Sequence, residues 1–145
     1  GRWHAFFQHN PVGLDWGNMH WGHAVSDDLI HWEQLGDALY PDETGDMFSG
    51  SAVIDSDDLL GLKNSEHDPV ILFYTAAGNG RELNRGKKVT QCMAYSTDGM
   101  KTFHKYAGNP VVPHIKGDNR DPKVVRKVRD GALSRRRRVR TADKR

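Results

Sequence analysis

AVSDDLIHWEQLGDALYP, residues 24–41, returns in altered form as AYSTDGMKTFHKYAGNPVVP, residues 94–113. Both copies contain Ala-x-Ser-x-Asp, then an aromatic residue four or five positions later, then a closing proline. In each copy we expect an apolar strand to end in a turn whose Ser and Asp side chains bond the backbone, with the aromatic residue packed over that turn. Such a repeat in an all-β chain is typical of propeller blades, although two copies also fit a β-sandwich.

Four short segments outside or overlapping this repeat have the composition of β-strands. They are rich in β-branched and aromatic residues, and turn-forming residues bound each of them. These segments are WHAFFQ (3–8), SGSAVID (49–55), VILFYTA (70–76) and TQCMAYS (90–96). No segment repeats its apolar residues with the period of a helix. The sequence therefore predicts an all-β fold of short strands over the first 120 residues or so.

The composition is that of a soluble globular protein. The chain has 145 residues, about one average domain, of which 37% are hydrophobic and 28% charged. No apolar run approaches the roughly 20 residues of a membrane-spanning helix, so we expect no membrane partner. A single cysteine, Cys92, excludes an internal disulfide framework and leaves the compartment open.

The net charge of +2 averages two unlike segments. Residues 1–120 carry 10 Lys/Arg and 16 Asp/Glu, a net of −6, whereas residues 121–145 carry 11 basic and 3 acidic residues, a net of +8. Residues 126–145 have no aromatic residue and include four consecutive arginines, which predicts a disordered extension or an out-of-frame tail. A nucleic-acid-binding function would rest on this tail alone, and we expect no nucleic-acid partner.

The stretch FFQHNPVGLDWGNMHWGH, residues 6–23, combines aromatic, amide and histidine side chains. His20 and His23 would lie on opposite faces of an extended strand, and no Cys or Glu stands at metal-ligand spacing, so hydrogen-bonding histidines are favoured over a metal site. Amides beside indoles suit a sugar site, because an indole face covers sugar C–H groups while amides bond hydroxyls. Gln8, Asn10, Trp16 and Trp21 are candidates, the alternative being that the tryptophans are core.

A second motif, DMFSGSAVID at residues 46–55, places Gly50 between two serines. Glycine at that point permits a close approach of the backbone to a ligand or to a neighbouring strand. A strand start packed tightly inside a blade explains the motif equally well.

The third motif, NRDPKV at residues 119–124, sets Arg120 directly against Asp121. Pro122 disfavours the helical region for Asp121, so the pair is expected in extended backbone with alternating side-chain directions. A fixed carboxylate near a guanidinium can accept two hydroxyl protons, as adjacent hydroxyls of a sugar would offer. The alternative is that both residues form surface ion pairs with other residues.

Taken in order, these blocks and the intervening sequence resemble glycoside hydrolase family 32, the β-fructofuranosidases, over about residues 2–125. The resemblance implies a five-bladed β-propeller catalytic domain, of which residues 1–125 would form the first two to three blades. It implies a glycosidase that releases terminal β-D-fructofuranosyl units from fructans or sucrose with retention, by two carboxyl groups about 5 Å apart. No metal or organic cofactor is implied.

By the same resemblance, Asp121 corresponds to the carboxylate that stabilises the transition state, and Arg120 to the arginine that orders the site. Gln8, Trp16, Phe48 and Ser49 correspond to residues that line the fructose pocket. Asn119 favours levanases and other exo-acting fructan hydrolases, since sucrose-6-phosphate hydrolases more often have Phe there. A secreted or periplasmic location is favoured over a cytoplasmic one.

Two of the family's catalytic carboxylates have no counterpart in this chain. No stretch matches the Trp-Met-Asn-Asp-Pro-Asn-Gly motif that carries the nucleophile, and no glutamate follows Glu82 to serve as the acid/base. We therefore expect a part of the catalytic domain, truncated at both ends and inactive alone. A non-catalytic carbohydrate-binding propeller is the alternative.

Overall fold

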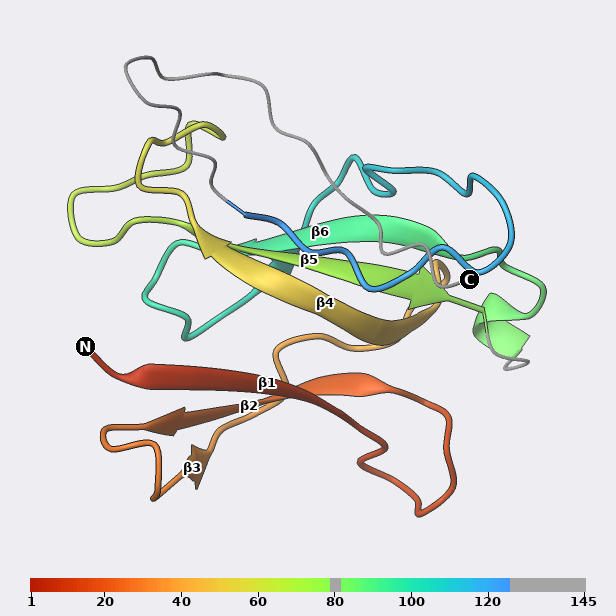
Figure 1. Cartoon of the computed structure of the whole chain (residues 1–145), viewed down its shortest axis with the longest axis horizontal. Helices are drawn as coiled ribbons and strands as arrows, with labels where there is room; N and C mark the ends of the chain where they lie inside the picture. The colour runs from red at the N-terminus through yellow and green to blue at the C-terminus, as the bar shows by residue number, and fades with distance from the viewer. Residues whose placement is uncertain (79–81, 126–145) are drawn as a thin grey trace.

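A computed structural model describes residues 1–78 and 82–125, which form two antiparallel sheets (Figure 1). The first sheet has the strand order β1-β2-β3, with β1 at Trp3–His9, β2 at His20–Ser26 and β3 at Glu33–Gln34. The second has the order β4-β5-β6-β7, with β4 at Asp46–Ile54, β5 at Val70–Ala77, β6 at Thr90–Ser96 and β7 at His104–Lys105. The single helical element described is a 3₁₀ turn, η1, at Glu82–Asn84, so the all-β prediction is confirmed. No helix in the described ranges could span a membrane.

The repeat corresponds to the last strand pair of each sheet. After β2, the Ser26 hydroxyl accepts the N–H of Leu29 (2.8 Å), and the Asp28 carboxylate accepts the N–H of His31 (2.8 Å). After β6, Ser96 and Asp98 make the corresponding bonds to the backbone of residues 100 and 101 (3.0 Å each). The Ser/Asp turns predicted from the sequence are confirmed, and each one leads into a short outer strand.

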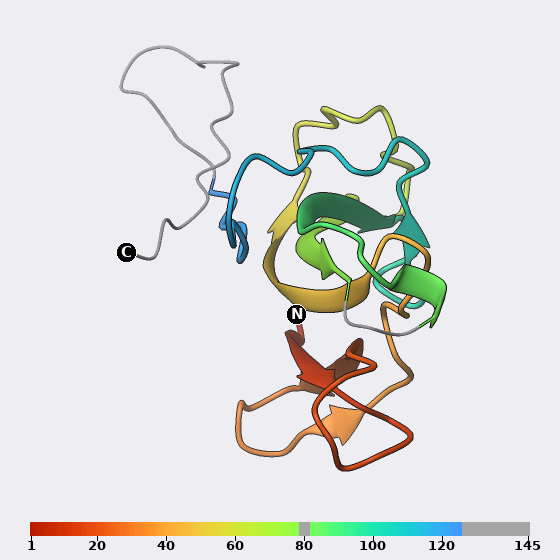
Figure 2. The same ribbon diagram turned by 90° about the vertical axis from the view of Figure 1, so that its right-hand side faces the viewer.

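The aromatic residues that follow the two turns have different surroundings. Trp32 bonds its own turn, its indole N–H donating to the carbonyl of Leu29 (3.1 Å), and it is 43% exposed. Its counterpart Phe103 instead reaches the first sheet, where it meets Phe6 and His23 edge-on at 5.6 and 5.7 Å between ring centroids. Phe103 therefore joins the two sheets, which Figure 2 shows stacked one above the other.

One apolar cluster spans both sheets and is the main core. It is built from buried residues of β2, β4, β5 and β6 and of the connection between the sheets: Trp21, Ala38, Leu39, Met47, Val70, Leu72, Tyr74, Ala76, Cys92 and Ala94. Trp21 is only 5% exposed, so it is a core residue, as the alternative held, and it is not a sugar-site residue. β5 is buried along its whole length and forms the centre of the second sheet.

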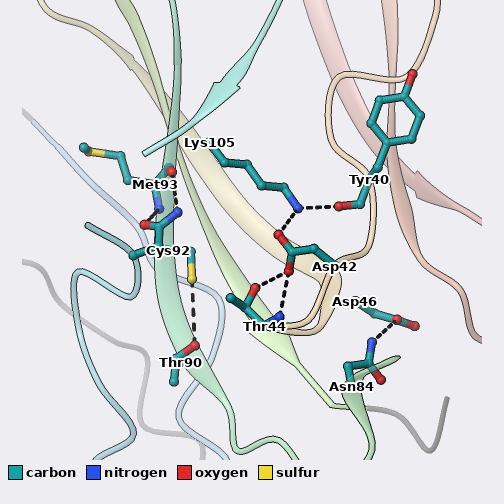
Figure 3. Close-up of polar contacts among 10 residues, drawn as sticks. Tyr40, Asp42, Thr44, Asp46, Asn84, Thr90, Cys92, Met93 and Lys105 are labelled. Carbon is teal, nitrogen blue, oxygen red and sulfur yellow. Dashed lines mark hydrogen bonds and ion pairs between the residues drawn. The ribbon is translucent and has the colours of Figure 1, made fainter. Parts of the chain in front are cut away.

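Polar contacts fix the connection between the sheets (Figure 3). The Lys105 ammonium donates to the carbonyl of Tyr40 and to the carboxylate of Asp42, each at 2.5 Å. Burial alone would raise the pKa of Asp42, but hydrogen bonds from Lys105 and Thr44 outweigh it, and the pKa lies below its ordinary value. The outermost strand of the second sheet thus holds the segment that arrives from the first.

His23 is buried beside Phe103 and pairs with the half-buried His4, and we predict that this pair makes stability depend on pH. Their ring nitrogens lie 2.9 Å apart. Burial is the main cause that lowers the pKa of His23 to about 4, and electrostatic repulsion from His4 is the second cause. In the unfolded chain His23 binds a proton near pH 6.5, whereas in the folded chain it does so only near pH 4. The folded state is therefore destabilised as the pH falls from about 6.5 to about 4. The expected loss is about 3 kcal/mol.

Urea denaturation at pH 7 and pH 4 measures this effect, with His23→Gln as the control that isolates it from titrating carboxylates. Wild type should lose about 3 kcal/mol more between the two pH values than the variant does. Equal pH dependence of the two proteins would contradict the assignment.

Candidate functional site

A β-bulge in β4 is the centre of the candidate site. The β4–β5 register pairs Met47 with Ala76 and Gly50 with Tyr74, so that Phe48 and Ser49 together stand opposite the single residue Thr75. A Cβ on Gly50 would lie 1.8 Å from the carbonyl oxygen of Phe73. The close approach that the glycine permits is therefore to the neighbouring strand. Bulges of this kind redirect side chains and are frequent beside active sites.

Four of the sequence-predicted residues come together in pairs around this bulge. The Gln8 amide donates to the Ser49 hydroxyl (2.6 Å), which joins the end of β1 to β4. Trp16, from the loop after β1, meets Phe48 edge-on at 5.6 Å between ring centroids and is 70% exposed. The backbone carbonyl of Phe48 accepts the indole N–H of the core residue Trp21 (2.9 Å), which fixes the bulge to the core.

Residues 119–124 run along the second sheet, where the blue end of the described chain crosses β4 and β5 in Figure 1. Ser51 holds this segment at two points, donating to the carbonyl of Pro122 (2.8 Å) and accepting the N–H of Val124 (3.0 Å). On β5, the Thr75 hydroxyl accepts the N–H of Asp121 (2.9 Å). The Arg-Asp-Pro motif is thus attached to the strand residue that faces Phe48 and Ser49.

Arg120 and Asp121 have different surroundings although they are neighbours in sequence. The Arg120 guanidinium pairs with Asp118 at 3.0 Å, and both side chains are well exposed. The surface ion pair weighed from the sequence is therefore correct for Arg120. The Asp121 carboxylate is half-buried and, within residues 1–78 and 82–125, has neither an ion-pair partner nor a hydrogen-bond donor. It is available to accept hydroxyl protons.

The backbone of Asp121 differs from the sequence-based expectation. Extended backbone was expected before Pro122, but Asp121 has φ = +62°. Proline disfavours the right-handed helical region for its predecessor without excluding positive φ, and aspartate tolerates such values better than most residues. The N–H bond to Thr75 holds Asp121 in this conformation.

The histidines of the first sheet are hydrogen-bonded, as the sequence favoured. His9 and His20 share the carboxylate of Asp37, at 2.7 and 2.9 Å, while His23 bonds His4. Among the described residues no three His, Cys, Asp or Glu side chains are arranged to hold a metal ion. Asp37 could not be identified as their partner from the sequence, because it lies well downstream of both histidines.

An open hollow exists elsewhere, at the opposite end of the β1–β2 pair from Gln8. Its lining is mainly charged: Arg2, Val25, Asp27, Asp28, His31, Trp32 and Glu33. None of the predicted sugar-binding residues contributes to it, so it is separate from the site at the bulge.

The family model and similar curated proteins point to the same family. The model for the Glycosyl hydrolases family 32 N-terminal domain matches residues 1–133. A levanase of Bacillus subtilis is 50% identical over 125 residues, which cover 86% of this chain and 17% of the levanase. An invertase of Schizosaccharomyces pombe is 44% identical over 133 residues, which cover 86% of this chain and 22% of the invertase. The chain therefore spans about a fifth of the length of these relatives.

Solved structures agree with the sequence matches. A β-fructofuranosidase of Schwanniomyces occidentalis, complexed with fructosyl-erythritol, has a TM-score of 0.74 at 39% identity, covering 86% of this chain and 24% of that protein. An exo-inulinase of Aspergillus awamori has a TM-score of 0.73 at 36% identity, covering 85% of this chain and 28% of that protein. Because the N-terminal domain of family 32 enzymes is a β-propeller, the predicted partial propeller is confirmed. The predicted tail, residues 126–145, lies outside the described residues.

We predict that Gly50→Ala destabilises the protein by about 3 kcal/mol or more, since the new methyl group would collide with the backbone of β5. Gly36→Ala is the matched control, because a Cβ at Gly36 meets no atom within 4 Å. Thermal and urea melts of the two variants test this. Equal stability of Gly50→Ala and wild type would mean that the bulge is not formed as described.

Proposed function

The chain belongs to glycoside hydrolase family 32, and on that premise we propose that it is part of an enzyme that releases terminal β-D-fructofuranosyl units from fructans or sucrose. The observation that carries the proposal is the Asp121 carboxylate, which has no partner among the described residues and is anchored through its own backbone beside the bulge that presents Phe48 and Ser49. Two relatives were solved in complex with sucrose and with fructosylnystose, which supports this substrate class.

In the proposed site, the sugar is held by aromatic and polar groups from different strands. Trp16 and Phe48 supply apolar surface for sugar C–H groups, while Gln8 and Ser49 supply an amide and a hydroxyl for sugar hydroxyls. The Gln8–Ser49 hydrogen bond orients both groups before substrate arrives. Preorganised polar groups lose less free energy on binding than mobile ones do.

Asp121 stabilises the transition state in this proposal. Cleavage of the glycosidic bond develops positive charge at the anomeric carbon, and a carboxylate that also accepts two sugar hydroxyls opposes that charge. Arg120 orders the neighbouring backbone through its pair with Asp118. The nucleophile and the acid/base have to come from residues other than these 145, since none of them matches the family's motifs for those roles.

We therefore predict that the 145-residue chain alone releases no fructose from sucrose, inulin or levan. Removing one member of a catalytic pair typically lowers the rate by several orders of magnitude. Activity should appear in a levanase chimera, in which residues 1–125 replace the matching segment of the Bacillus subtilis levanase. Fructose release by the pure 145-residue chain, or a folded but inactive chimera, would contradict the proposed function.

In the levanase chimera, Asp121→Asn should lower kcat a few hundred-fold while changing KM far less. Asparagine keeps the shape and one acceptor but loses the charge, so the transition state loses about 3–4 kcal/mol of stabilisation. Asp27→Asn is the control, because Asp27 is 80% exposed and lies with Arg2 at the other end of the first sheet. Steady-state kinetics on sucrose and a short fructan measure the effect. A near-wild-type kcat for Asp121→Asn would exclude the proposed role.

A further inference from the structure

We propose that Thr75 and Gln91 are positioning residues for Asp121, acting from beneath the site without touching the sugar. This inference rests on the proposed function of Asp121. Both side chains are polar and fully buried, at 0% exposure, Thr75 in β5 and Gln91 in β6. They stand directly opposite each other in the β5–β6 register.

Three hydrogen bonds run from Asp121 through this pair and back to the same segment. The Asp121 N–H donates to Thr75 Oγ1 (2.9 Å), and the Thr75 hydroxyl donates to Gln91 Oε1 (2.8 Å). Gln91 Nε2 then donates to the backbone carbonyl of Asn119 (2.8 Å). The Thr75 hydroxyl both accepts and donates here, so its direction is fixed by two partners.

The two anchor points lie on either side of Arg120, and they fix the backbone that carries the catalytic carboxylate. A non-glycine residue at positive φ costs about 1 kcal/mol or more and persists only where its surroundings hold it. Asp121, at φ = +62°, is held in this way by Thr75. Because its carboxylate has no partner among the described residues, the backbone is what determines where that carboxylate points.

Thr75 also lies opposite the bulge, so it is adjacent to the proposed sugar-binding residues as well as bonded to Asp121. Phe48 and Ser49 stand opposite Thr75 across the β4–β5 pair. One buried residue therefore sets the spacing between the proposed sugar-binding residues and the proposed stabilising carboxylate. A displacement of about 1 Å at such a site can lower the rate by a factor of 10².

A purely structural role for the pair makes a different prediction. Buried threonine and glutamine groups need partners in any protein, and their loss lowers stability wherever they lie. A structural role would lower the melting temperature and leave kcat unchanged below it. A positioning role would lower kcat, and that loss would disappear once Asp121 no longer carries its charge.

The test uses the levanase chimera with Thr75→Val, which keeps the side-chain shape and removes the hydroxyl. We expect kcat to fall about 10- to 100-fold, with KM changed by no more than about 2-fold. Thr75→Ser, which keeps the hydroxyl, should recover most of the lost kcat. Thr90→Val is the matched control and should leave kcat unchanged, since among the described residues the Thr90 hydroxyl has one hydrogen-bond partner, the Cys92 sulfur (3.8 Å), and does not belong to the hydrogen bonds that reach Asp121.

The double variant Thr75→Val/Asp121→Asn gives the sharpest readout. If Thr75 acts through Asp121, the double variant should be about as slow as Asp121→Asn alone. The proposal would be overturned if the two substitutions lowered kcat independently, so that the double variant showed the product of the two single losses. It would also be overturned if Thr75→Val had a wild-type kcat and only a lowered melting temperature. Should Thr75→Val not fold, Gln91→Met is judged by the same criteria, because it breaks the same circuit. A folded chimera with wild-type residues and no activity would instead remove the proposed function on which this inference rests.

Discussion

All eight residues of β5 are buried, so each polar atom in that strand needs a hydrogen-bond partner inside the protein. Most of the strand is apolar and satisfies this requirement through its sheet bonds. The strand carries two side-chain hydroxyls, those of Tyr74 and Thr75, and the Thr75 hydroxyl bonds both Gln91 of the adjacent strand and the backbone of Asp121. The burial that makes β5 the centre of the second sheet is thus also what attaches the Arg-Asp-Pro segment to that sheet.

The packing of the two sheets brings the remaining site residues to the same place. Phe103 reaches from the second sheet to Phe6 and His23 in the first, and Trp21 crosses in the other direction to bond the carbonyl of Phe48. These contacts fix β1 relative to β4, so that the Gln8 amide meets the Ser49 hydroxyl. A site on a propeller depends in this way on the contacts between blades as much as on the residues that face the substrate.

Composition was enough to predict most of the strands, and the repeat was enough to predict the Ser/Asp turns, because both depend on residues close together in sequence. The ordered blocks predicted the family and the candidate residues. Three features could not be predicted, since each needs a contact between distant segments: the bulge opposite Thr75, the positive φ of Asp121, and the circuit through Gln91. The available signal for the last of these was the polar residue Gln91 in the predicted strand TQCMAYS (90–96) and the polar residue Thr75 in the predicted strand VILFYTA (70–76).

The two tryptophans proposed for sugar contact show a similar limit. Trp16 and Trp21 stand in the same short stretch, yet one is 70% exposed beside Phe48 and the other 5% exposed in the core. Composition cannot separate them, because an indole suits a sugar face and a protein interior equally well.

The most direct test of the proposed site is a crystal structure of the levanase chimera with bound fructose. It should show both Asp121 carboxylate oxygens within hydrogen-bond distance of adjacent fructose hydroxyls, with Trp16 and Phe48 against the ring. Fructose bound elsewhere, with Asp121 remote from it, would contradict the account.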